Sequence, residues 1–131
     1  MPSHYEYTLL DRNSGINPLA FPYDITTNAV WLGTNEGTNL RSTDFGGPPP
    51  SWSPGGGAVA GTDSTGFNAL MTEYESGGLF PNIGSISSWF WTSTAFDVDK
   101  AWTRSLWHNF GSVRRSYEDK KNGYSIRCVK D

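Results

Sequence analysis

The last third of the chain, from residue 88 onward, alternates strand-forming segments with short polar turns, and this pattern restricts the possible folds most. The segments are rich in aromatic and β-branched residues, which favour strands. Asn122-Gly123 is a strong signal for a tight hairpin turn. We therefore predict an antiparallel meander with strands at 90–94, 101–107, 112–116 and 124–129.

Side chains in the predicted strand at 101–107 must alternate between the two faces of the sheet. One face carries Ala101, Thr103, Ser105 and Trp107, and the other carries Trp102, Arg104 and Leu106. Alternation by itself does not decide which of the two faces is buried.

The preceding segments are predicted to be short strands joined by irregular structure. We expect strands at 5–10 and 29–32, with a turn at 11–15. Residues 44–66 contain the runs Pro-Pro-Pro and Gly-Gly-Gly and are expected to form one long loop. No window shows sustained helical periodicity, so the 131 residues indicate one loop-rich domain with little helix.

Charge is distributed unevenly along a chain whose net charge is −3. Eight of the ten lysines and arginines follow residue 99, whereas ten of the 13 acidic residues lie within residues 1–99. The acidic balance and the lack of a nucleic-acid-binding motif exclude nucleic acid as the expected partner. No apolar run approaches the roughly 20 residues needed to span a bilayer, so we expect no membrane insertion. The first residues do not form a recognisable signal peptide.

No arrangement typical of catalysis or of a bound cofactor is recognisable, so we expect neither. The single cysteine, Cys128, excludes an intrachain disulfide, and its position in the predicted strand at 124–129 favours a buried thiol. Asp97 and Asp99 could offer two carboxylates to Ca²⁺. Two aspartates in a turn more often accept hydrogen bonds from their own backbone, which makes them weak calcium candidates.

Residues 102–118 concentrate the side-chain types that dominate binding hot spots. About half of their aromatic rings should belong to the core. Adjacent strand residues point to opposite faces, so at least one of Arg114 and Arg115 must be exposed. The segment contains Trp102, Arg104, Trp107, His108, Phe110, Arg114, Arg115 and Tyr117.

Several motifs in a consistent order resemble the Fibrobacter succinogenes major paralogous domain. The final segment, NGYSIRCVKD, resembles the family's GFSVRCVRD, and WTST resembles its WSST. The resemblance divides the chain into a lectin-like domain at 39–131 and N-terminal strands and linker at 1–38, which pack on that domain or complete it. The motifs lie at 39–43, 66–70, 78–84, 91–106 and 122–131.

The resemblance implies an α+β, C-type-lectin-like fold with short antiparallel strands and long loops, related to the variable proteins of diversity-generating retroelements. Residues 1–38 lack the family's usual helix-forming segment, so that helix is missing, replaced or supplied by another chain. The resemblance also implies a ligand-binding face on the hairpins. Its expected contacts are Trp107, His108, Arg114, Tyr117, Ser105 and Phe110, and its framework is Trp91, Trp102, Ala101, Leu106, Val113, Ile126 and Cys128.

We therefore expect a non-catalytic recognition module of a bacterial surface protein or a phage tail or fibre. Its ligand would be a glycan or a protein, and its location would be extracellular, on the cell surface or on a virion. The alternative is a structural domain with the same fold and no small ligand, which assembles a homo-oligomer or forms part of a larger chain.

Overall fold

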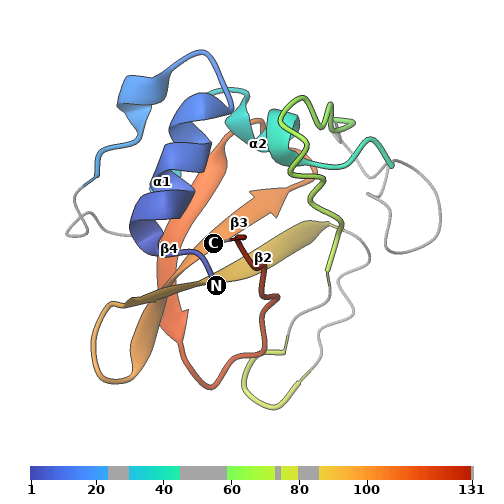
Figure 1. The fold of residues 1–131 in the computed structure, drawn as a ribbon. Coiled ribbons are helices and arrows are strands. Elements are labelled where there is room, and N and C mark those ends of the chain that lie inside the picture. Colours follow the sequence, from blue (N-terminus) through green and yellow to red (C-terminus); the bar gives the residue numbers. More distant parts are fainter. Residues whose placement is uncertain (24–29, 45–58, 73–74, 80–85, 131) are drawn as a thin grey trace.

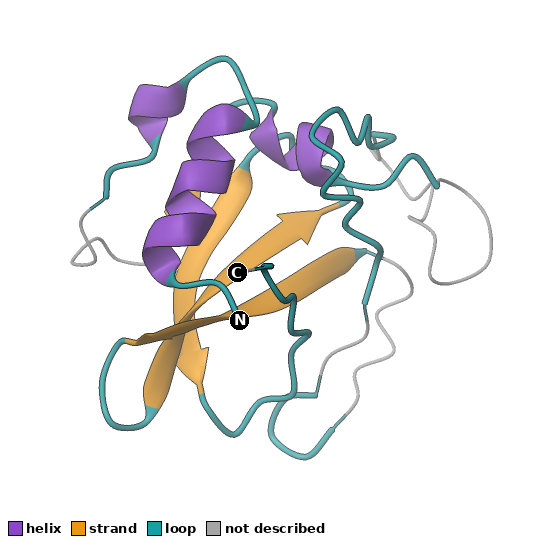
Figure 2. Ribbon diagram, viewed as in Figure 1, coloured by secondary structure: helices purple, strands orange, loops and turns teal. Residues whose placement is uncertain are grey.

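The computed structural model describes residues 1–23, 30–44, 59–72, 75–79 and 86–130. They form an α+β fold in which two helices and a four-stranded antiparallel sheet are the main elements (Figure 2). In chain order these elements are α1 (His4–Asn13), the 3-10 helix η1 (Pro18–Ala20), β1 (Val30–Leu32), α2 (Glu36–Leu40), β2 (Ser87–Ala95), β3 (Lys100–Trp107) and β4 (Val113–Asp119) (Figure 1).

The strands lie in the order β1-β4-β3-β2, and all neighbours are antiparallel. Strands β2, β3 and β4 form a meander, which confirms three of the four strands predicted for the last third of the chain. Strand β1 confirms the strand predicted at 29–32. It pairs with β4 through Val30 and Arg115, 85 residues apart in sequence, so a non-local strand completes the sheet.

The strand predicted at 124–129 is wrong, because this segment makes only one isolated bridge to the outer edge of β2. Ser125 accepts a hydrogen bond from the Trp91 amide and donates one to the Trp89 carbonyl, each at 3.0 Å. Without a continuous ladder, the segment does not bury alternate side chains. Cys128 is exposed, so the predicted burial of its thiol is wrong, and Ile126, which was expected to be framework, is 62% exposed.

The strand predicted at 5–10 and the start of the turn predicted at 11–15 are also wrong, because residues 4–13 form helix α1. Ser3 and Glu6 cap its first turn: Ser3 Oγ accepts from the Glu6 amide at 3.1 Å, and the Glu6 carboxylate accepts from the Ser3 amide at 2.7 Å. The buried side of the helix has helical spacing but is mostly polar, so hydrophobic periodicity did not reveal it. It consists of His4, Tyr7, Thr8 and Asp11.

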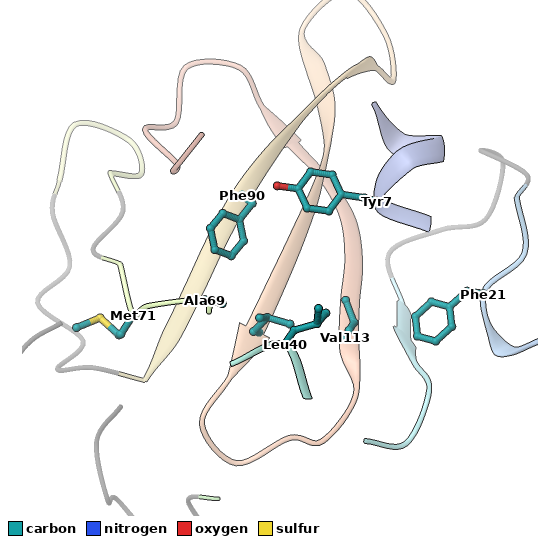
Figure 3. Close-up of a cluster of buried hydrophobic side chains, with 8 residues drawn as sticks. Tyr7, Phe21, Leu40, Ala69, Met71, Phe90 and Val113 are labelled. Atoms are coloured by element: carbon teal, nitrogen blue, oxygen red, sulfur yellow. The ribbon is translucent and has the colours of Figure 1, made fainter. Parts of the chain in front are cut away.

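Helix α1 lies across one face of the sheet, and the apolar core fills the space between that face and the surrounding segments (Figures 1 and 3). Two segments singled out by sequence, 39–43 and 66–70, meet here. The Ala69 amide donates to the Leu40 carbonyl at 2.9 Å, and the Ser42 amide donates to the Ala69 carbonyl at 3.0 Å. The core cluster consists of Tyr7, Phe21, Leu40, Ala69, Met71, Phe90, Leu106 and Val113.

A buried ion pair joins α1 to the centre of β3. Arg104 Nε donates to Asp11 Oδ2 at 2.7 Å, and both side chains are at least 98% buried. The same guanidinium donates to Thr8 Oγ1 at 3.0 Å. Burial raises the pKa of the Asp11 carboxyl, and the Arg104 charge opposes that shift. The face of β3 that carries Trp102, Arg104 and Leu106 is therefore the face covered by α1.

We predict that Asp11→Ala lowers the free energy of unfolding by about 3–5 kcal/mol, because it leaves the Arg104 cation buried without its carboxylate. The double variant Asp11→Leu/Arg104→Met should recover most of this loss, since well-packed apolar residues can replace a buried pair at little cost. Urea unfolding followed by tryptophan fluorescence measures both effects. Asn13→Ala, on the exposed side of α1, is the control, and an equal midpoint for Asp11→Ala and Asn13→Ala would contradict the prediction.

Candidate functional site

A continuous row of aromatic side chains lies across the sheet face opposite α1, and we call it the aromatic row. Its central members are Trp107 on β3 and Trp89 on β2, whose ring centroids are 6.4 Å apart. Strand alternation puts both on the face that Trp102 and Arg104 do not occupy. The centroid distances along the row are 4.3 Å for Phe110–Trp31, 6.1 Å for Trp31–Trp107, 5.1 Å for Trp89–Tyr124 and 4.8 Å for Tyr124–Trp91.

Exposure changes along the aromatic row. Trp89 at its centre is only 5% exposed, whereas Trp31 and Phe110 at one end are 37% and 41% exposed. The rings of Trp31 and Phe110 are stacked with an angle of 16° between their planes. Trp107 is half-buried and meets Trp31 edge-on, at 77°. The Trp31 end of the row therefore offers a flat, accessible aromatic surface, while the centre is packed as structure.

Buried hydroxyl groups lie beneath the aromatic row and orient its indoles. Trp107 Nε1 donates to Ser105 Oγ at 3.3 Å, and Trp89 Nε1 donates to Ser87 Oγ at 3.1 Å. Ser105 is fully buried. The structure therefore places Ser105, one of the residues predicted to contact ligand, under Trp107, where it fixes the indole instead of facing solvent.

Arg114 adds a positive charge beside the row. Its guanidinium carbon lies 5.3 Å from the centre of the Trp89 ring, within the range of a cation–π contact. Arg114 is opposite Trp31 on β1 and Ser105 on β3, and its side chain is half-buried. It can therefore supply directional N–H donors at the edge of the aromatic surface.

The backbone at Trp107 is held in place by a buried arginine. The Arg41 guanidinium donates to the Trp107 carbonyl and to Thr38 Oγ1, the second at 3.2 Å. Burial lowers the pKa of Arg41 to about 10, which still leaves it charged at neutral pH. Arg41 belongs to the segment at 39–43, so this sequence motif anchors the site without contacting its surface.

The turn between β3 and β4, which carries His108 and Phe110, is held by backbone hydrogen bonds to other segments. The His108 amide donates to the Ile86 carbonyl, and the Val59 amide donates to the His108 carbonyl, each at 2.9 Å. The Gly37 amide at the start of α2 donates to the Gly111 carbonyl at 2.6 Å. A Cβ at Gly37 would come within 2.3 Å of the Ser112 carbonyl oxygen, so this close approach requires glycine. These contacts fix the backbone that carries Phe110.

The structure brings together some of the predicted contact residues and separates one. Trp107, Arg114 and Phe110 share the aromatic row, and His108 follows Trp107 with its side chain half-buried. Tyr117 lies on the opposite face, three residues beyond Arg114.

The surroundings of Tyr117 belong to the α1 face of the sheet. Its ring is stacked on Phe96 at 3.9 Å and meets Trp102 edge-on at 5.5 Å. Trp102 is fully buried, as its predicted framework role requires. The expectation that Tyr117 shares a surface with Trp107 is therefore wrong.

Four members of the aromatic row were not predicted to be part of the site, and one of them, Trp91, was expected to be framework. Trp31 lies on a strand that was predicted, but its pairing with β4 is non-local. Trp89 precedes the predicted start of β2, and Tyr124 lies in the segment that was mistaken for a strand. The alternation of Trp89 and Trp91 along β2 was the available signal for one shared face.

The weak calcium candidates form a turn stabilised by its own backbone. Asp97 Oδ1 accepts hydrogen bonds from the amides of Asp99 at 2.9 Å and Lys100 at 2.7 Å. Within the described ranges, no three His, Cys, Asp or Glu side chains are grouped so that they could hold a metal ion. In the same part of the chain, no helix has the length and apolar character needed to cross a membrane.

The family model described as the Fibrobacter succinogenes major domain matches residues 1–130. The match includes residues 1–38, which the sequence motifs did not cover. Comparison with curated proteins and with solved structures gives no match.

We predict that removing the buried Trp89 ring destabilises the domain more than removing the exposed Trp31 ring. Trp89→Ala should lower the free energy of unfolding by about 3–5 kcal/mol, because it removes a packed ring and leaves a cavity in its place. Trp31→Ala should cost about 1 kcal/mol, because its ring is more than a third exposed. Chemical denaturation of both variants and the wild type measures the difference. Equal destabilisation would show that Trp31 is part of the packed core.

Proposed function

The chain belongs to the Fibrobacter succinogenes major domain family, and on that premise we propose that it is a non-catalytic recognition module. Its ligand binds at the exposed end of the aromatic row, formed by Trp31, Phe110, Trp107 and Arg114. The host is a bacterial surface protein or a phage tail or fibre. The proposal includes a C-type-lectin-like fold, which is supported by a helix packed on an antiparallel meander with long connecting segments.

The stacked pair of Trp31 and Phe110 carries the proposal. Two large aromatic rings, each more than a third exposed, are stacked on one another, with Trp107 and Arg114 beside them. Contiguous exposed apolar surface marks interaction sites, and tryptophan and arginine dominate binding hot spots. The hydrogen bonds that hold the β3–β4 turn fix this surface before a ligand arrives, which lowers the entropy lost on binding.

The shape of this surface favours a glycan over a protein segment as the ligand. A sugar ring has an apolar C–H face that can lie flat on an aromatic ring, and hydroxyl groups at its rim that accept hydrogen bonds. An exposed ring of the Trp31–Phe110 stack supplies the flat aromatic surface, and Arg114 supplies donors beside it. We therefore propose a glycan as the first ligand class and an exposed protein segment as the second.

A structural or assembly role is the alternative, and the turn between β2 and β3 favours it. Phe96 and Val98 on this turn are exposed apolar side chains. They lie beyond the strand ends, away from the Trp31 end of the aromatic row, and could meet the same turn of a second copy. Light scattering distinguishes the two roles. Association that disappears in Val98→Asp and persists in Trp31→Ala would favour assembly.

We predict that Trp31→Ala and Phe110→Ala each weaken glycan binding by at least about tenfold, as expected when a hot-spot ring is removed. Binding is measured on a glycan array and then by titration calorimetry with the glycan that binds. Arg114→Gln should weaken binding through the loss of its charged donors. Leu19→Ala, which removes an exposed apolar side chain on η1, is the control and should bind as the wild type does.

An unchanged affinity in both ring variants would remove the aromatic row as the binding surface. Each variant must first show the circular dichroism spectrum and unfolding midpoint of a folded domain. If no glycan on the array binds, but a purified surface protein binds and Trp31→Ala weakens that binding, the ligand is an exposed protein segment.

A further inference from the structure

A concave site lies on the α1 side of the sheet, away from the aromatic row. It is a pocket of about 300 Å³ between helix α1, the loop at Phe67 and the last described residues of the chain. Figure 1 shows the two ends of the chain close together in this region. Leu10, Phe67 and Val129 make much of its wall apolar, and Tyr7, Arg127 and Cys128 supply its polar groups.

Tyr7 lines this pocket, and its side chain carries a buried hydroxyl group. The side chain is only 2% exposed, and its Oη has no hydrogen-bond partner within the described parts of the chain. A buried hydroxyl without a partner costs about 1–3 kcal/mol. Burial raises the pKa of the Tyr7 phenol, so it keeps its proton at neutral pH and can donate it to a ligand.

Arg127 brings a positive charge to the same pocket. Its guanidinium lies over the Phe67 ring, 4.7 Å from the ring centre, and donates to the Phe67 carbonyl. A guanidinium has five N–H groups, so this position leaves it able to bind a carboxylate as well. Arg127 and Tyr7 both line this pocket, so both side chains can act on one ligand.

The one carboxylate in the pocket lining is already engaged. Glu6 accepts hydrogen bonds from the Ser3 amide at 2.7 Å and from Ser3 Oγ at 2.8 Å, as part of the cap of α1. Its charge is therefore turned toward the start of the helix. The donors that remain for a ligand are the Tyr7 hydroxyl and the Arg127 guanidinium.

We propose that this pocket binds a small organic carboxylate with a single ring or a short hydrocarbon body. The carboxylate accepts hydrogen bonds from Tyr7 and Arg127, and the body packs against Leu10, Phe67 and Val129. The volume is at the lower end of the range for ligand pockets, which restricts the ligand to a small molecule. Neither the family match nor the aromatic row accounts for this site.

Cys128 makes the proposal directly testable. It is the only cysteine of the chain, its thiol is exposed, and it lines the pocket. A bound molecule that fills the pocket covers this thiol and slows its alkylation. The rate of modification by iodoacetamide, followed by mass spectrometry of the intact chain, therefore reports occupancy.

The experiment compares phenylacetate with the neutral analogue phenylacetamide on the full chain. At saturation, phenylacetate should remove most of the alkylation rate of Cys128, and phenylacetamide should require a much higher concentration for the same effect. Tyr7→Phe should raise the concentration of phenylacetate needed by about tenfold, as expected for one lost hydrogen bond to a charged group. Tyr5→Phe, at an exposed position of the same helix, is the matched control and should behave as the wild type.

Folding of the variants is checked independently by thermal unfolding. Tyr7→Phe should unfold at or above the wild-type temperature, because the hydroxyl it removes has no partner in the described structure. A second variant, Leu10→Trp, fills the pocket and should abolish protection by phenylacetate. Three outcomes would each overturn the proposal. They are equal protection by the amide and the carboxylate, an unchanged concentration of phenylacetate needed in Tyr7→Phe, and no protection by phenylacetate at its solubility limit.

Discussion

The buried pair of Arg104 and Asp11 determines how the rest of the domain is arranged. Two opposite charges taken out of water must remain paired, so their contact fixes α1 against the centre of β3 in one position. The helix then covers the face that holds Trp102 and Leu106, and strand alternation leaves Ser105 and Trp107 on the other face. One ion pair thus separates the face that stabilises the domain from the face that carries the aromatic row.

The aromatic row depends on that separation, because its orientation comes from groups within the sheet. Ser87 and Ser105 accept hydrogen bonds from the indoles of Trp89 and Trp107, and Arg41 holds the backbone at the end of β3. Wide aromatic side chains therefore lie on a layer of small buried hydroxyl residues. This arrangement gives the exposed rings fixed positions without using their outer surfaces.

Sequence patterns predicted those parts of the fold that are set by local alternation and turns. Strands β1 to β4 follow that rule. The framework role of Trp102 followed from the family resemblance, because alternation did not decide which face of β3 is buried. Helix α1 was missed because its buried stripe is polar, although Ser3 and Glu6 have the spacing of a capping box and gave a usable signal. The segment at 124–129 has strand-like alternation, but whether a strand forms depends on a partner edge. Tyr117 was assigned to the wrong face because its face depends on the pairing of β3 with β4, in which Tyr117 lies opposite Trp102.

The pairing of β1 with β4 also links surface formation to the order of folding. The stacked rings of Trp31 and Phe110 come from positions about 80 residues apart, and contacts at such high sequence separation form late because loop closure must precede them. A meander of β2, β3 and β4 can form from neighbouring segments without producing this surface. The flat aromatic surface therefore exists only in chains that have completed their most distant strand pairing, and its presence distinguishes the native domain from partly folded forms.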